Sequence, residues 1–181
     1  MPQFVALLRG VNVGKAKRVP MEKLRTLLSE LKFTSVATLL NSGNAVFHAS
    51  QGTSAKHAAN IAAAISNKLQ LEVPVVVKSA TELGAIVVGN SIKVEAPDHP
   101  RLLVVFTQDT KALSGLSAIA ELVVPPEQFV VGENAAYLLC ARGILESKAA
   151  QALLGQGGQL ATTRNFATTL KLQALANKCA A

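Results

Sequence analysis

The chain has 181 residues, of which 50% are hydrophobic and 4% aromatic, and a net charge of +7 at pH 7. This length and apolar content suffice for a buried core and exclude a wholly disordered protein. The apolar runs are strand-sized, shorter than the roughly 18 residues that a membrane helix needs, and residues 1–9 lack the pattern of a secretory signal. Two cysteines cannot form a disulfide framework or a complete structural zinc site. The sequence therefore predicts a soluble, cytoplasmic α/β protein with no membrane partner, metal or cofactor.

The positive charge is spread along the chain and forms no long block of Lys and Arg. A net charge of this sign permits binding to phosphate, nucleic acid or acidic proteins, but by itself it favours only a solvated basic surface. The scarcity of aromatic residues argues against a platform that stacks RNA bases.

The first half of the chain predicts the order strand, helix, strand, strand, helix, strand. Residues 3–9 form a short apolar run typical of a buried strand. Pro20 suits the first turn of a helix, and an apolar stripe with helical spacing follows it. Residues 41–44, Asn-Ser-Gly-Asn, join the next two strands as a hairpin. The other predicted elements are strands at residues 35–40, 45–48 and 73–77 and a helix at residues 56–71.

The same order of elements is predicted again in the second half. A capping box from Ser79 to Glu82 opens a linking helix, and the polar, turn-rich residues 89–100 mark the boundary between the halves. Gly155 ends one helix, and Asn165 caps the last one. The predicted strands are residues 101–107, 128–131, 135–140 and 159–162, and the predicted helices before the last are residues 110–123 and 145–154.

This order is that of the split βαβ, or ferredoxin-like, unit. The hairpin places neighbouring strands in antiparallel directions, which argues against a purely parallel sheet. The sequence thus predicts an α+β fold with duplicated ferredoxin-like (βαββαβ) units, antiparallel sheets and an extra C-terminal helix. The first unit, with the linking helix, comprises residues 1–90, and the second comprises residues 91–181.

Three segments together resemble a known family. The N-terminal FVALLRGVNVGKAKRVPMEKLRTLLSELKF, the hairpin LNSGNAVF and the late ATTRNFATTLKL are similar to the domain of unknown function 1697 family of uncharacterised bacterial proteins. The resemblance implies a ferredoxin-like duplication and supplies no activity, substrate or catalytic residue. Relatives tend to have a Tyr-rich, Pro-Asn-Gly stretch before a Ser-Lys pair, whereas this chain has YLLCARG at residues 137–143, followed by Ser147 and Lys148.

Glycines, cations and hydroxyls follow three of the predicted strands, and two of these strands lead to the N-terminus of a helix. Glycines let backbone N–H groups converge on an anion, and the positive end of a helix attracts it. The first loop lacks the Gly-Lys-Ser/Thr ending of a P-loop. The alternatives are a basic surface loop, a tight turn and simple helix capping. The candidate ligand-binding residues are Arg9, Gly10, Asn12, Gly14, Lys15, Ser42, Asn44, Arg164 and Asn165.

The other side chains that could bind a metal or act in catalysis give little indication of a site. The three histidines have no metal-like spacing, and His57 is expected on the solvated face of its helix. Ser147 and Lys148 are expected to face solvent, and Cys140 is expected to be a small core residue. No pair of carboxylates indicates acid–base chemistry, so the catalytic residues, if there are any, stay unknown.

The best functional interpretation is a module that binds a small anion or a phosphate-bearing ligand. Two alternatives stay open: an enzyme acting on a phosphorylated metabolite, with Arg9, Lys15 and Arg164 as electrostatic clamps, and a nucleic-acid binder that uses the basic surface. We also expect an exposed Arg164 to share one anion site with the first loop. The oligomeric state stays open.

Overall fold

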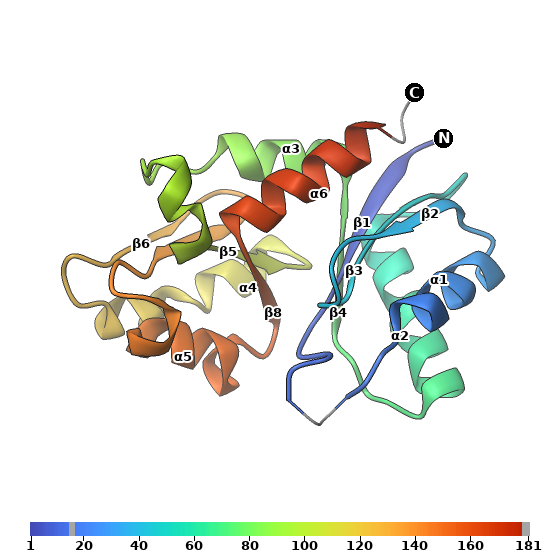
Figure 1. Cartoon of the computed structure of the whole chain (residues 1–181), viewed down its shortest axis with the longest axis horizontal. Coiled ribbons are helices and arrows are strands. Elements are labelled where there is room, and N and C mark those ends of the chain that lie inside the picture. The colour runs from blue at the N-terminus through green and yellow to red at the C-terminus, as the bar shows by residue number, and fades with distance from the viewer. Residues whose placement is uncertain (15–16, 179–181) are drawn as a thin grey trace. The chain divides into compact units, whose positions relative to one another are not determined.

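The computed structural model describes residues 1–14 and 17–178, and the chain divides into two compact units (Figure 1). The first unit comprises Met1–Leu83 and the segment that begins at Leu172, and the second comprises Gly84–Lys171. Each unit contains one four-stranded sheet in which every pair of neighbouring strands is antiparallel. The prediction of antiparallel sheets with helices is confirmed. Within the described residues, no helix is both long and apolar enough to cross a membrane.

The first unit follows the predicted order of elements. Its sheet has the order β2-β3-β1-β4. The bounds are β1 (Gln3–Leu8), α1 (Met21–Glu30), β2 (Thr34–Thr38), β3 (Asn44–His48), α2 (Ser54–Leu69) and β4 (Val75–Ser79). The helix α2 begins two residues earlier than predicted, because the Thr53 side chain accepts a hydrogen bond from the Lys56 N–H at 3.2 Å and caps it.

The core of the first unit lies between the sheet and the helices α1 and α2, which cover the same face of the sheet in Figure 1. Every second residue of β1 points into this core, since side chains alternate along a strand. The core side chains include Phe4, Ala6 and Leu8 of β1, Phe47 of β3, Leu24 and Leu28 of α1, and Ile61 and Ile65 of α2.

The second unit has the sheet order β6-β7-β5-β8. Its strands are β5 (Leu102–Thr107), β6 (Gln128–Val131), β7 (Ala136–Leu139) and β8 (Ala161–Asn165), and its helices α4 (Thr110–Ser114) and α5 (Lys148–Leu154) pack on one face. The helix predicted at residues 110–123 is interrupted at Gly115 and continues as a 3-10 turn, Ser117–Leu122. The division between the units falls within α3 (Ala80–Val88) and within α6 (Phe166–Lys178).

Two predictions about the second unit have opposite outcomes. Cys140 is fully buried, as expected, and burial raises the pKa of its thiol to about 11. The prediction that Ser147 faces solvent is wrong. Its side chain is buried and accepts a hydrogen bond from the Ala150 N–H at 3.1 Å, so it caps α5, while Lys148 is exposed.

Tyr137 fixes the end of α3 against the second sheet. Its hydroxyl donates a hydrogen bond to the Ile86 carbonyl oxygen at 2.5 Å. The ring is 1% exposed, and burial raises the pKa of the phenol to about 12. The polar atom of this buried ring therefore has the partner that its burial requires.

Candidate functional site

The first loop is held in place by the side chain of Asn12. Its amide nitrogen donates to the carbonyl oxygens of Val19 and Asn41, both at 2.8 Å, and its amide oxygen accepts from the Val19 N–H at 2.9 Å. Both amide hydrogens are thus used inside the protein. Asn12 joins the two ends of the loop to each other and to the hairpin, which is a structural role.

The hairpin packs directly on the end of β1. The Leu8 N–H donates to the Gly43 carbonyl oxygen at 2.8 Å. The side chain of Asn44 is fully buried and donates to the Leu39 carbonyl oxygen at 3.1 Å and to the Ser42 hydroxyl at 3.3 Å. The structure therefore brings the first loop and the hairpin together, and the amide of Asn44 stabilises the turn.

The other first-loop candidates that the structure describes lie near this corner of the first unit. Arg9 directly follows β1, is half-buried, and has a pKa lowered by burial. Gly10 and Gly14 are exposed and have φ angles of 63° and 62°, a region that glycine adopts without strain. Lys15 lies outside the described residues. An anion-binding role for these residues stays a prediction.

Arg164 and Asn165 belong to the second unit, at the end of β8. The prediction that Arg164 is exposed is wrong: it is partly buried, and burial lowers its pKa to about 10. Its Nη1 atom donates to the Thr162 hydroxyl at 3.0 Å and to the Thr163 carbonyl oxygen at 2.7 Å. Asn165 caps α6 as predicted, since its Oδ1 atom accepts from the Thr168 N–H at 2.8 Å. A shared anion site with the first loop stays a prediction.

His57 is the feature that sequence reasoning missed. The prediction that it lies on a solvated helix face is wrong, since it is 3% exposed. Its ring meets Phe4, Phe33 and Phe47 edge to face, with centroid distances of 4.6, 5.1 and 5.8 Å. Both ring nitrogens are buried, and neither has a hydrogen-bond partner. A buried polar group left in this state costs about 1–3 kcal/mol, so it needs an explanation.

His57 lines a pocket of about 250 Å³ that opens at the start of α2. We call this hollow the His57 pocket. Its wall is formed by the end of α1 and the following turn, by the segment between β3 and α2, and by the first two turns of α2. The lining residues are Leu31, Lys32, Phe33, Ala49, Ser50, Gln51, Gly52, Lys56, His57 and Asn60.

The electrostatics of the His57 pocket favour an anion. Two of its lining residues, Lys32 and Lys56, are exposed lysines, and none of the lining residues given above is acidic. The pocket also lies at the N-terminus of a 16-residue helix, where the helix dipole is positive. Burial, followed by the charge of Lys56, lowers the pKa of His57, so the free imidazole is neutral near pH 7.

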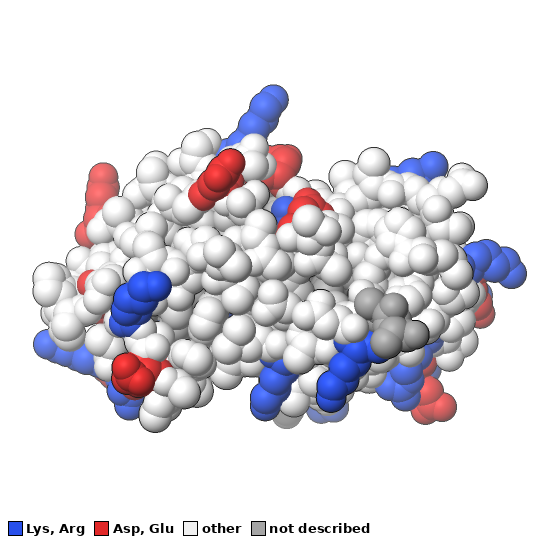
Figure 2. All heavy atoms as spheres, turned by 90° about the horizontal axis from the view of Figure 1, so that it is seen from above, with Lys and Arg blue, Asp and Glu red and all other residues white. Residues whose placement is uncertain are grey.

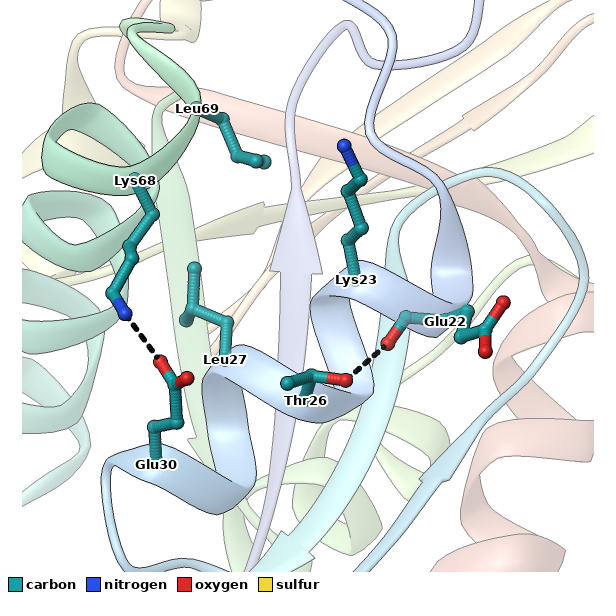
Figure 3. Close-up of a pocket in the computed structure, with 7 residues that line it drawn as sticks. All are labelled: Glu22, Lys23, Thr26, Leu27, Glu30, Lys68 and Leu69. Atoms are coloured by element: carbon teal, nitrogen blue, oxygen red, sulfur yellow. Dashed lines mark hydrogen bonds and ion pairs between the residues drawn. The ribbon is translucent and has the colours of Figure 1, made fainter.

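A second hollow in the first unit, of about 430 Å³, lies between α1 and α2 (Figure 3). Figure 3 shows that Glu30 of α1 pairs with Lys68 of α2, at 3.0 Å, while the Thr26 hydroxyl donates to the Glu22 carbonyl oxygen. Its lining includes two acidic and two basic side chains, with Leu27 and Leu69 between them. This groove is larger than the His57 pocket, but its charges balance, and it offers no preference for an anion.

Other kinds of site find little support in the described part of the chain. No three His, Cys, Asp or Glu side chains within residues 1–14 and 17–178 come together as a metal site would require. Figure 2 shows one face of the molecule, on which several Lys and Arg side chains lie along the lower edge and others project singly among acidic and uncharged residues.

Comparisons with known proteins agree with the fold and are silent on activity. A family model described as a protein of unknown function (DUF1697) matches residues 1–137. Among solved structures, the chain is similar to the conserved bacterial protein SP0830 from Streptococcus pneumoniae. The two have 20% sequence identity and a TM-score of 0.80, and the alignment covers 97% of this chain and 98% of that one. No curated protein matches the chain.

Proposed function

The chain belongs to the DUF1697 family, whose function is unknown, and we propose that it is a binding protein for a small anion or a phosphate-bearing ligand. In this proposal the ligand occupies the His57 pocket. One observation carries this proposal: a buried histidine without polar partners lies in the wall of a pocket whose charged lining residues are lysines. A volume of about 250 Å³ suits a phosphate group with a few attached carbon atoms, and is too small for a long polymer segment.

We further infer that the two units are duplicated ferredoxin-like units. In support, each sheet places the third strand of its unit beside the first, and the fourth strand on the other side of the first.

The duplication does not extend to the chemistry of the pocket. His57 is four residues after the cap of α2, whereas the equivalent position in α5, four residues after Ser147, is the exposed Gln151. The binding function is therefore assigned to the first unit.

Replacing either lysine of the pocket is expected to weaken anion binding about tenfold, the loss that follows from removing one charge-assisted hydrogen bond. Calorimetric titration with inorganic phosphate and with glycerol 3-phosphate measures this for wild type, Lys32→Gln and Lys56→Gln. The matched control is Lys23→Gln, which removes an exposed lysine from the groove between α1 and α2.

Four outcomes are informative. Weakening by both pocket variants, with the control unchanged, supports the proposal. Equal affinity of all four proteins would place the anion elsewhere and contradict it, and so would an absence of binding to wild type. Binding to DNA or RNA that grows with polymer length and falls steeply with salt would instead support the nucleic-acid alternative.

A further inference from the structure

The aromatic neighbours of His57 leave one of its ring nitrogens without a partner. A neutral imidazole has one N–H donor and one lone-pair acceptor. The ring meets Phe4, Phe33 and Phe47 edge to face, and the face of a phenyl ring accepts an N–H only weakly. These phenyl rings offer no N–H or O–H to the acceptor nitrogen, and neither nitrogen has a hydrogen-bond partner in the structure. This lone pair is the place where a proton can be taken up.

Gly52 lies close to the ring of His57, and both residues line the pocket. Its φ angle is 110°, and a Cβ atom at residue 52 would lie 2.7 Å from Cε1 and 3.0 Å from Nε2 of His57. The backbone of Gly52 thus lies close to the Cε1–Nε2 edge of the ring, and a residue with a side chain would not fit there without a shift. For Nε2 to contact a ligand in the pocket, this backbone has to move away from the ring.

Burial, followed by the nearby positive charge, disfavours the protonated form of His57 in the free protein. The charged residues that line the pocket together with His57 are Lys56 on its own helix and Lys32 in the turn after α1, and the positive end of α2 adds to them. No acidic residue is among the described lining residues. A bound anion would neutralise these cations and accept a hydrogen bond from the ring, and both effects favour the imidazolium form.

We propose that His57 is the specificity-determining residue of the His57 pocket: it takes up one proton when an anion binds and donates it in a hydrogen bond to an anionic oxygen of the ligand. This inference rests on the proposed function. The proton comes from solvent and is added to a ring nitrogen, and no covalent bond of the ligand changes. The pocket would thus select doubly charged oxyanions, such as sulfate or a phosphate monoester, over singly charged carboxylates of similar size.

The direction of the pH dependence follows from linkage. Binding raises the pKa of His57, so protons are taken up between the pKa of the free protein and that of the complex. In this interval the affinity falls as the pH rises, by at most about tenfold for each pH unit. Below and above the interval, His57 has the same protonation state with and without ligand, and the affinity becomes constant.

Calorimetric titration with sulfate tests this inference, because sulfate does not itself titrate near neutral pH. The titration is run from about pH 5 to about pH 8, where histidine changes its charge, in pairs of buffers with different ionisation enthalpies, which report the number of protons taken up. Wild type is compared with His57→Gln, which can form hydrogen bonds but cannot titrate, and with the control His99→Gln in the second unit.

The expected result is uptake of up to one proton by wild type and by His99→Gln, and a pH-independent, weaker affinity of His57→Gln. Sulfate binding to wild type without proton uptake would overturn this inference and leave the proposed function standing. Retention of the full pH dependence by His57→Gln would do the same. If His57→Gln does not fold, the proton uptake measured with wild type alone decides between the two results. Failure of wild type to bind sulfate at any pH would overturn the proposed function as well.

Discussion

Gly43→Ala is expected to lower the free energy of unfolding by about 3 kcal/mol, the sum of left-handed backbone strain and overpacking. Gly43 has a φ angle of 76°, and an added Cβ atom would lie 2.6 Å from Leu8 Cβ and 2.6 Å from Val11 Cγ2. Leu8 Cβ is fixed to the backbone of β1, so the clash cannot be relieved by turning a side chain. Urea denaturation of the variant measures the loss.

Gly10→Ala is the matched control for this variant. Gly10 has a φ angle of 63°, but an added Cβ atom would have nothing within 4 Å. The Gly10→Ala variant is expected to lower the free energy of unfolding by about 1–2 kcal/mol, which is the backbone strain alone. Equal losses at the two positions would contradict the close packing of the hairpin on β1.

Glu82→Ala is expected to lower the free energy of unfolding by about 2 kcal/mol, because it removes an acceptor of several charge-assisted hydrogen bonds. Glu82 Oε2 accepts from the Ser79 N–H at 2.6 Å and from the Ser54 hydroxyl at 2.7 Å, and Oε1 lies 3.9 Å from Lys78 Nζ. The carboxylate thus completes the capping box of α3 and joins it to the first turn of α2. The matched control is Glu121→Ala, an exposed glutamate, for which less than about 0.5 kcal/mol is expected.

The contribution of Glu82 should depend on pH with a defined sign. Burial by itself raises the pKa of this carboxyl, but the hydrogen bonds from Ser79 and Ser54 and the charge of Lys78 outweigh burial and lower it below 4.5. A carboxylate whose pKa is lowered by folding stabilises the protein above its unfolded pKa, and this stabilisation is lost as the pH falls through the folded pKa. The difference in the free energy of unfolding between wild type and Glu82→Gln should be largest at neutral pH and should become smaller in acid. A constant difference would contradict the hydrogen-bonded carboxylate.

Much of the fold could be predicted from the sequence because the pattern of apolar residues is local information. The central strands β1 and β5 are continuous apolar runs, and the capping side chains of Glu82 and Asn165 mark helix starts at the predicted places. The helix broken at Gly115 was predicted as continuous, since a single glycine lowers helix stability by only about 1 kcal/mol and does not fix where a helix stops.

The candidate site was harder to predict because it depends on contacts between distant segments. The amide of Asn12 reaches Asn41, 29 residues away, and this distant contact gives it a structural role. His57 precedes Ile61 and Ile65 at spacings of four, so it lies on the buried stripe of α2, and this spacing was the signal that could have revealed its burial. Its aromatic neighbours come from three other segments, which no local pattern could identify.

The most direct test of the central claim is the NMR signal of the His57 ring during a titration with inorganic phosphate. The chain has 3 histidines, so His48 and His99 serve as internal controls, and His57→Gln assigns the signal. If phosphate binds in the His57 pocket, the Cε1–H signal of His57 shifts toward the position of a protonated ring and saturates, while the signals of His48 and His99 stay unchanged. An unchanged His57 signal at saturating phosphate would contradict the assignment of an anion site to the His57 pocket.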